Sequence, residues 1–181
     1  MRDPVFPGVD IRIIEEAAMP EDADCAIRET LAICFPHKAD IYSRRRSTHE
    51  MPAWTVCAFD AAGTAVALTA VTDRTVLLIS PDGTEGDPSS PAAGRNIRVA
   101  GVGTVSALPQ YRGTGLIDRV MAMILAEARS RGYDAGMLFC KPPLMPVYRR
   151  MGWRVHESPV LVRGDDGAPW IKNPSGMHFA M

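Results

Sequence analysis

The chain has 181 residues, of which 46% are hydrophobic, so it is long enough for one core and short for two. Its 20 basic residues are balanced by 21 acidic ones, giving a net charge of −1, which argues against nucleic acid or an anionic membrane as partner. We therefore expect a single domain over residues 1–181, without a membrane-spanning run.

The N-terminal part is predicted to contain a strand and a helix. Apolar and polar residues alternate over residues 9–14, which is typical of a strand. An acid-rich start favours a helix over about residues 23–34, which Pro36 ends. Residues 37–52 are polar and irregular, and the three arginines at 44–46 are interpreted as a solvated loop. The alternative is that they contact a phosphate or an acidic acceptor.

A β-hairpin is expected next in the chain. Residues 54–59 and 64–72 read as its two strands, joined across residues 60–63, where Gly63 supplies conformational freedom. Residues 75–80 continue the second strand or form a further one. The segment 81–94 is rich in Pro, Gly, Ser and Asp and is predicted to be a loop.

The C-terminal half is predicted to alternate strands and helices. Residues 98–107 are β-rich and lead through a glycine-containing turn into an amphipathic helix that Gly132 stops. The apolar face of this helix comprises Leu116, Ile117, Val120, Met121, Ile124 and Ala128. The elements expected after it are a strand at 134–140, a sixth strand at 155–162, a turn at 164–167 and a terminal strand at 176–181. The sum is an α/β domain with three layers.

The cysteines indicate neither a disulfide framework nor a zinc site. Cys25, Cys34, Cys57 and Cys140 are spread without Cys-x-x-Cys spacing, so they read as reduced thiols. The N-terminal residues contain no long apolar core. A cytoplasmic protein without a bound metal is the expectation.

The turn after the β-rich run is a candidate phosphate site. Gly113 and Gly115 lack a Cβ, so the main chain can adopt a positive φ and a phosphate can approach it closely. The following helix presents unpaired N–H groups and the positive end of its dipole there. Gln110 and Arg112 add donors beside it. The alternative is that the glycines only close a tight turn.

Two separated motifs resemble those of one superfamily. Gln110-x-x-Gly113-x-Gly115 matches the Gln/Arg-x-x-Gly-x-Gly/Ala signature of the GCN5-related N-acetyltransferase (GNAT) superfamily. Tyr148-x-x-x-Gly152-Trp153 is similar to the Tyr-x-x-x-Gly-Phe element that follows the fifth strand in that superfamily. The resemblance implies an α/β, three-layer GNAT-like fold whose mixed central β-sheet splays between its fourth and fifth strands.

The resemblance also implies that acetyl-CoA is the co-substrate. Main-chain groups of the splayed fourth strand would bind the pantetheine arm as an added strand does, and the turn would bind the pyrophosphate. The cofactor-binding residues implied are Val105, Ser106, Ala107, Gln110, Arg112, Gly113, Thr114, Gly115 and Leu116.

Tyr148 is the candidate general acid, because the corresponding tyrosine of the superfamily lies beside the cofactor sulfur. Its alternative role is that of a packed aromatic whose hydroxyl is tied to a carbonyl. Cys140 ends the strand near the expected thioester, but no His or acid is close to it in sequence. We interpret Cys140 as a small buried hydrophobe.

The general base is not evident, because residues 98–107 contain no acidic side chain. Pro109-x-x-Arg112-x-x-Gly115-Leu116 resembles the pattern of the enhanced-intracellular-survival and aminoglycoside acetyltransferases, a subgroup whose resemblance implies the C-terminal carboxylate, here that of Met181, as base. That subgroup has additional domains, and we expect only one domain in these 181 residues. A water chain is the alternative, and the other candidate residues are His156, Glu157 and His178.

Two classes of function are open at this point. The first is an N-acyltransferase that transfers an acyl group directly, in a ternary complex, to a primary amine of a small molecule such as an aminoglycoside, a polyamine or an amino sugar. A resemblance to nodulation acyltransferases allows a longer acyl donor. The second is a catalytically silent acyl-CoA-binding regulatory module, which the missing acid favours. A homodimer is one alternative for the oligomeric state.

Overall fold

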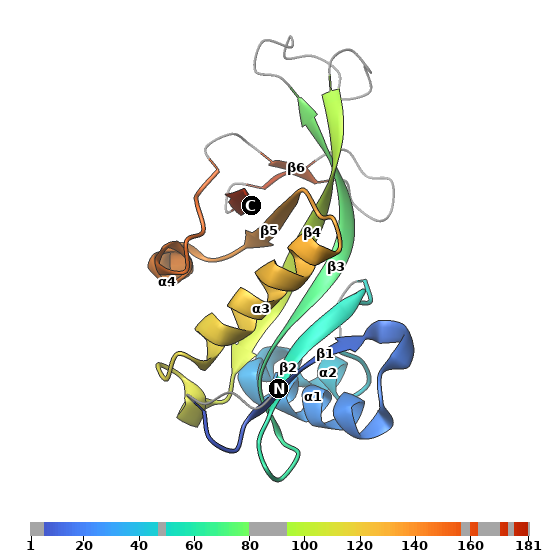
Figure 1. The fold of residues 1–181 in the computed structure, drawn as a ribbon, viewed down its shortest axis with the longest axis vertical. Coiled ribbons are helices and arrows are strands. Elements are labelled where there is room, and N and C mark those ends of the chain that lie inside the picture. Colours follow the sequence, from blue (N-terminus) through green and yellow to red (C-terminus); the bar gives the residue numbers. More distant parts are fainter. Residues whose placement is uncertain are drawn as a thin grey trace.

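The computed structural model describes residues 6–46, 50–79, 94–156, 160–162, 171–173 and 176–180. A six-stranded sheet in the order β1-β2-β3-β4-β5-β8 forms its centre, and β6 and β7 form a separate pair (Figure 1). The strands are β1 Asp10–Glu15, β2 Trp54–Phe59, β3 Ala65–Ile79, β4 Gly94–Ala107, β5 Ala135–Phe139, β6 Val160–Val162, β7 Ile171–Asn173 and β8 Gly176–Ala180. The helices are α1 Glu21–Cys34, α2 Ala39–Tyr42, α3 Leu116–Ser130 and α4 Met145–Arg150, and the 3-10 turns are η1 Glu16–Ala18, η2 Pro36–Lys38, η3 Pro109–Tyr111 and η4 Pro142–Leu144.

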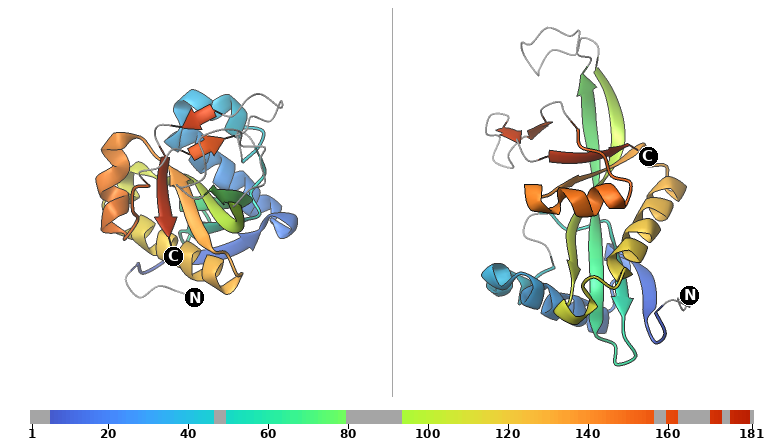
Figure 2. Two further views of the ribbon diagram at one scale, coloured as in Figure 1. Left: turned by 90° about the horizontal axis from the view of Figure 1, so that it is seen from above. Right: turned by 90° about the vertical axis from the view of Figure 1, so that its left-hand side faces the viewer.

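The sheet is mixed. Strands β1 to β4 are antiparallel neighbours, β5 runs parallel to β4, and β8 is antiparallel to β5. Helices α1 and α3 lie on opposite faces of the sheet (Figure 2), which gives the three layers that the sequence predicts. Within the described ranges, no helix is long and apolar enough to cross a bilayer.

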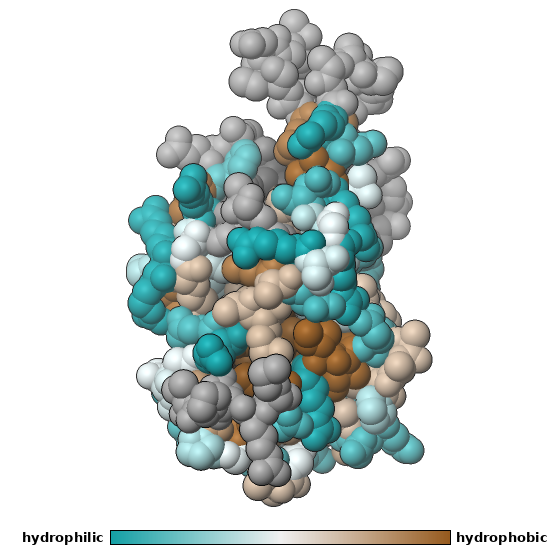
Figure 3. Space-filling model, in the orientation of Figure 1, coloured by the Kyte–Doolittle hydropathy of each residue, from teal (hydrophilic) through white to brown (hydrophobic). Residues whose placement is uncertain are grey.

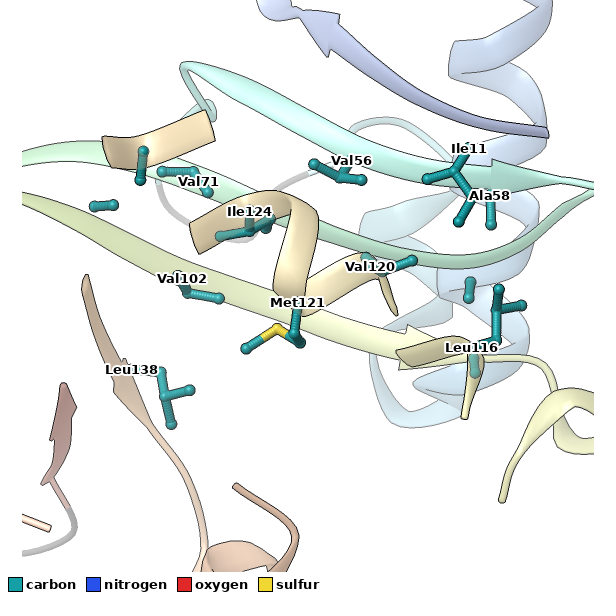
Figure 4. Close-up of a cluster of buried hydrophobic side chains, with 14 of the residues drawn as sticks. Ile11, Val56, Ala58, Val71, Val102, Leu116, Val120, Met121, Ile124 and Leu138 are labelled. Atoms are coloured by element: carbon teal, nitrogen blue, oxygen red, sulfur yellow. The ribbon is translucent and has the colours of Figure 1, made fainter. Parts of the chain in front are cut away.

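Helix α3 packs its apolar stripe on the sheet. Leu116, Val120, Met121, Ile124 and Ala128 are buried, and this face meets Val56, Val71 and Val102 of the sheet (Figure 4). A second cluster lies under α1 on the other face, where Ile27 and Leu31 pack against β2 and β3. The 3.6-residue period of each helix therefore sets which face is buried.

The C-terminal end of α3 is tied to β1 by charge. Arg131, just beyond the helix, pairs with Glu15 of β1 and with Glu127 of α3. The hydrogen bond from Arg131 lowers the pKa of Glu15. The guanidinium also lies over the ring of Trp54, 4.7 Å from its centroid, which adds a cation–π contact.

Strand β3 is longer than either predicted strand. It runs without interruption from Ala65 to Ile79, so the expected segments 64–72 and 75–80 belong to one strand. Its pairing with β2 ends at Val71, whereas its pairing with β4 continues to Ile79. A two-stranded arm of β3 and β4 therefore projects beyond the sheet, and its apolar residues Leu77 and Leu78 are exposed. The space-filling view shows hydrophobic surface on this projection (Figure 3).

The expectations for the C-terminal region need correction at one element. The predicted sixth strand, 155–162, includes Val155, which is not in a strand, and β6 covers only Val160–Val162. It pairs with β7 and not with the main sheet. The terminal strand is present as β8, although Met181 and the predicted turn at 164–167 lie outside the described residues. So does most of the predicted 81–94 loop.

The arginine run is not simply a solvated loop, because Arg46 is buried. It is 8% exposed and forms ion pairs with Glu16 and Asp24. Arg28 of α1 completes the cluster by pairing with Asp24 at 2.8 Å and by donating to the carbonyl of Ser43 at 2.7 Å. These contacts fasten the segment after α2 to α1, since a buried cation requires partners.

Replacing Arg46 by alanine should lower the free energy of unfolding by about 3 kcal/mol, because Glu16 would remain half-buried without its cation. The exposed neighbour Arg44 provides the matched control, and Arg44→Ala should change stability by less than about 0.5 kcal/mol. Urea unfolding of both variants measures the difference. Equal stability of the two variants would mean that the cluster does not fasten this segment.

Candidate functional site

Strands β4 and β5 separate soon after they meet. Their parallel register contains only Val99 with Ala135, Ala100 with Gly136, and Gly101 with Met137. Beyond Gly101, no described strand pairs with β4 on this side up to its end at Ala107. Because β5 continues to Phe139 without this partner, the two strands open as a fork (Figure 1).

A β-bulge in β4 lies at the fork. The register with β3 shifts so that Thr69 faces both Thr104 and Val105. Thr104 has a φ of 50°, in the left-handed region that β-branched residues rarely adopt. The hydroxyl of Thr69 donates to the carbonyl of Gly103 at 3.0 Å and holds the strand on the β3 side. An extra residue increases local bending, so the bulge turns the end of β4 away from β5.

The main chain of Ala107 faces the fork. The amide of Leu108 donates to the carbonyl of Val66 at 2.9 Å, so the main-chain groups of Leu108 point towards β3. Because main-chain direction alternates along a strand, the main-chain groups of Ala107 point away from β3. Its carbonyl accepts from Arg112 Nε at 3.1 Å and from Cys34 Sγ at 3.3 Å. The guanidinium of Arg112 is thus turned back onto the strand end, beside the Cys34 thiol.

The turn between β4 and α3 contains the two glycines in left-handed conformations. Gly113 has a φ of 73°, and Gly115, the N-cap of α3, has a φ of 89°. A Cβ added at Gly113 would meet no atom within 4 Å, so its backbone angle, and not its surroundings, requires glycine. The approach to this turn is open.

The start of α3 carries no side-chain cap. Thr114 Oγ1 donates to the carbonyl of Tyr111 at 2.7 Å, which holds the turn, and accepts a long hydrogen bond of 3.4 Å from the amide of Leu116. The first-turn amides and the positive end of the dipole of α3 therefore face the turn and suit an anion. Gln110 and Arg112 are exposed at its rim.

The Tyr-x-x-x-Gly-Trp motif holds Tyr148 in place. Gly152 has a φ of 87°, and the amides of Gly152 and Trp153 donate to the carbonyls of Arg149 and Tyr148 at 2.9 and 3.1 Å. This is the Schellman pattern that ends a helix on a left-handed glycine. The chain turns back, and the Trp153 ring packs edge-on against Tyr148 with centroids 6.2 Å apart.

Tyr148 is buried beside Cys140, the residue that follows β5. Burial, with a smaller contribution from Cys140, raises the pKa of Tyr148 to about 12. The phenol is therefore protonated at neutral pH. Burial also raises the pKa of the Cys140 thiol, which makes it a poor nucleophile.

A groove of about 270 Å³ lies between α3 and α4, beside the first turn of α3. Asp118 and Arg150 face each other across it at 3.6 Å. Its lining residues are Asp118, Met121, Ala122, Leu125, Arg150 and Met151. Sequence reasoning did not identify this groove, because Arg150 and Asp118 come from helices that only the tertiary fold brings together.

The candidate bases fall at different places. The main chain of His178 in β8 pairs with Met137, in the sheet row where β4 and β5 begin to separate, and Ala180 pairs with Ala135 at the closed end. His156 is exposed after α4. Met181 and Glu157 lie outside the described residues. In the described part of the chain, no group of three His, Cys, Asp or Glu side chains could hold a metal.

The comparisons with known proteins agree with this geometry. Residues 91–156 match the model of the acetyltransferase (GNAT) domain family, and this segment contains β4, the turn, α3, β5 and Tyr148. No curated protein matches the sequence at a significant level.

Solved structures are similar over most of the chain. An acyl-CoA N-acyltransferase from Pseudomonas aeruginosa is 18% identical, with a TM-score of 0.60 over 95% of this chain and 99% of its own. A GNAT family acetyltransferase from Brucella melitensis, solved with acetyl-CoA, is 18% identical, with a TM-score of 0.54 over 86% and 94%. A GNAT family N-acetyltransferase from Escherichia coli, solved with CoA, is 17% identical, with a TM-score of 0.54 over 86% and 73%. The chain therefore has the GNAT fold, as the sequence predicts.

Replacing Gly113 by valine should weaken coenzyme A binding by about tenfold, because a β-branched residue disfavours the left-handed conformation that aims the turn amides. Gly63 is the matched control: its φ is 83°, and a Cβ there also meets nothing within 4 Å. Both variants should lose similar stability, but only Gly113→Val should lose affinity by calorimetry. Unchanged affinity in Gly113→Val would remove the turn from the binding site.

Proposed function

We propose that the chain is an acyl-CoA-dependent N-acyltransferase, with acetyl-CoA as donor and a primary amine of a small molecule as acceptor. The observation that carries the proposal is the loss of the β5 partner along β4 directly ahead of an uncapped helix start. The unpaired edge of β4 suits a peptide-like arm, and the start of α3 suits a phosphate.

Each part of coenzyme A has a matching feature in the chain. The amides from Gly113 to Leu116 would hold the pyrophosphate, with Thr114 stabilising the turn and Gln110 at its rim. Val105, Ser106 and Ala107 would pair with the pantetheine arm. The carbonyl of Ala107 accepts a hydrogen bond from Arg112 Nε. Arg112 would release this carbonyl when the pantetheine arm binds, and its guanidinium would then be available to the phosphates.

In the proposed reaction the amine attacks the acyl carbonyl directly, in a ternary complex. Acyl-CoA supplies the activated carbonyl and a thiolate leaving group, and main-chain N–H groups of β4 at the bulge would stabilise the oxyanion. Tyr148 would donate its proton to the departing sulfur. With its pKa at about 12, it is well protonated, and a strong hydrogen bond to the sulfur precedes proton transfer.

The base is proposed to be a water relay or a group near the C-terminus, with the Met181 carboxylate as one candidate. The register supports His178 as a second candidate, because its main chain lies in the row that contains Gly101 and Met137. Water could link either group to the acceptor ammonium.

The proposal also includes the class of acceptor, the cellular location and the oligomeric state. The Pro109-x-x-Arg112-x-x-Gly115-Leu116 pattern supports an acceptor of the aminoglycoside, amino-sugar or polyamine class. We propose that residues 1–181 act as one catalytic domain in the cytoplasm, as a monomer or a homodimer. A thiol-release assay with acetyl-CoA and a panel of amines tests the activity, and binding of CoA without turnover of any amine would favour the silent regulatory module.

Replacing Tyr148 by phenylalanine should lower turnover by about 10²-fold and leave CoA affinity unchanged, because the ring stays packed on Trp153 and only the proton is lost. In the native protein, one tyrosine should ionise near pH 12, and this step should disappear from the ultraviolet titration of the variant. Preserved turnover with weakened affinity would assign Tyr148 a structural role.

The base can be identified by two changes made in parallel. A short extension after Met181 moves the carboxylate away, and His178→Gln removes a titratable group while keeping a polar side chain. If the carboxylate is the base, only the extension should lower turnover and shift the acidic limb of the pH-rate profile; if His178 is the base, only the substitution should. If both variants keep the native pH-rate profile, neither the Met181 carboxylate nor His178 is the base, and a water relay is the remaining proposal.

A further inference from the structure

Thr104 combines two unfavourable features. Its φ of 50° is an outlier for a β-branched residue, in a conformation that glycine adopts without strain. Its Oγ1 is also buried without a hydrogen-bond partner within the described part of the chain, so no hydrogen bond offsets the loss of its hydration. A glycine would relieve the first feature and a valine the second.

The bulge itself does not require a threonine. Bulges with a left-handed first residue are formed most readily by glycine, which has no Cβ to strain. The neighbouring contact that fixes the strand comes from Thr69, whose hydroxyl donates to the Gly103 carbonyl. The side chain of Thr104 therefore adds nothing to this contact, and its unsatisfied hydroxyl is free to donate to an acceptor that is not part of the chain.

The position of Thr104 identifies the partner. It lies in the stretch of β4 beyond Gly101 that has lost its β5 neighbour. Next to it, Gly103 is exposed, and a Cβ added there would meet no atom within 4 Å, so this neighbouring strand position is open on its own face of the sheet. In the proposed site, the phosphates of an acyl-CoA bind at the Gly113–Leu116 turn and its pantetheine arm runs along β4 from Ala107 towards Gly101. The end of this arm that is furthest from the phosphates then lies at Thr104. In an acyl-CoA this end carries the thioester.

We infer that Thr104 is a substrate-binding residue whose hydroxyl donates a hydrogen bond to the thioester carbonyl oxygen of the acyl donor. The inference rests on the proposed function, because it names a contact within that site. The bond would pair the hydroxyl that is unsatisfied in the chain alone, and it would polarise the carbonyl towards the attacking amine. Main-chain donors at the bulge could act on the same oxygen.

Coenzyme A and acetyl-CoA provide the direct test, because they share every group except the acyl carbonyl and its methyl. Thr104→Val keeps the shape of the side chain and removes the hydroxyl. It should raise the Kd of acetyl-CoA about fivefold, the equivalent of one hydrogen bond, and leave the Kd of CoA within about twofold. Thr104→Ser keeps a hydroxyl and should bind both ligands within about twofold of the native protein.

Thermal unfolding gives a readout that needs no ligand. Thr104→Val removes an unsatisfied buried hydroxyl and Thr104→Gly removes the strain, so neither should unfold at a lower temperature than the native protein. If Thr104 served only the structure, Thr104→Val and Thr104→Gly would both unfold at a lower temperature than the native protein. Thr75→Val, an exposed change on the arm of β3, is the control for strand threonines and should alter neither affinity.

The outcomes separate this inference from the proposed function. If the native protein binds neither ligand, the proposed function fails and the inference falls with it. If the native protein binds both and Thr104→Val keeps the native ratio of the two affinities, the inference alone is overturned. The inference is supported if Thr104→Val changes the ratio of the acetyl-CoA and CoA dissociation constants and Thr104→Ser restores the native ratio.

Discussion

The structure depends on where β4 stops pairing with β5. A strand with an unpaired edge exposes main-chain donors and acceptors that need partners, and parallel pairing ends here at Gly101 with Met137. Two elements of the proposed site follow from it in the chain: the turn with Gly113 and Gly115 comes after the end of β4, and Tyr148 comes after β5, the strand that leaves this edge. The proposed site is thus a consequence of incomplete pairing between β4 and β5.

The rest of the fold keeps the fork rigid on one side. Helix α3 begins at the turn and is packed along its whole buried stripe against β2, β3 and β4. Its far end is fastened by Arg131, which joins β1, α3 and the face of Trp54. On the opposite face, Arg46 fastens the segment after α2 to α1. The start of α3, at the proposed anion site, is therefore held in a fixed orientation, which would preorganise its amides for an anion.

The sequence predicted those features that depend on local chemistry. Gly113 and Gly115 adopt positive φ values, as expected of glycines in this turn, and the α3 stripe follows from its period. Thr104 gave no such signal, because a β-branched residue within a β-rich run reads as an ordinary strand position. The burial of Arg46 and the separate pairing of β6 depend on contacts between distant segments, which spacing along the chain does not encode.

The short β4–β5 ladder also has a mechanical consequence. Three residue pairs form a pivot, and β5 with β8 extends from it as a lever whose tip, at Phe139, is the point furthest from the pairing. A small rotation at the pivot displaces the tip more than the base, while Leu138, packed in the core cluster with α3, limits how far the lever turns. A rotation at the pivot therefore changes the width of the fork most at Phe139 and least beside Gly101, at little cost in backbone hydrogen bonds.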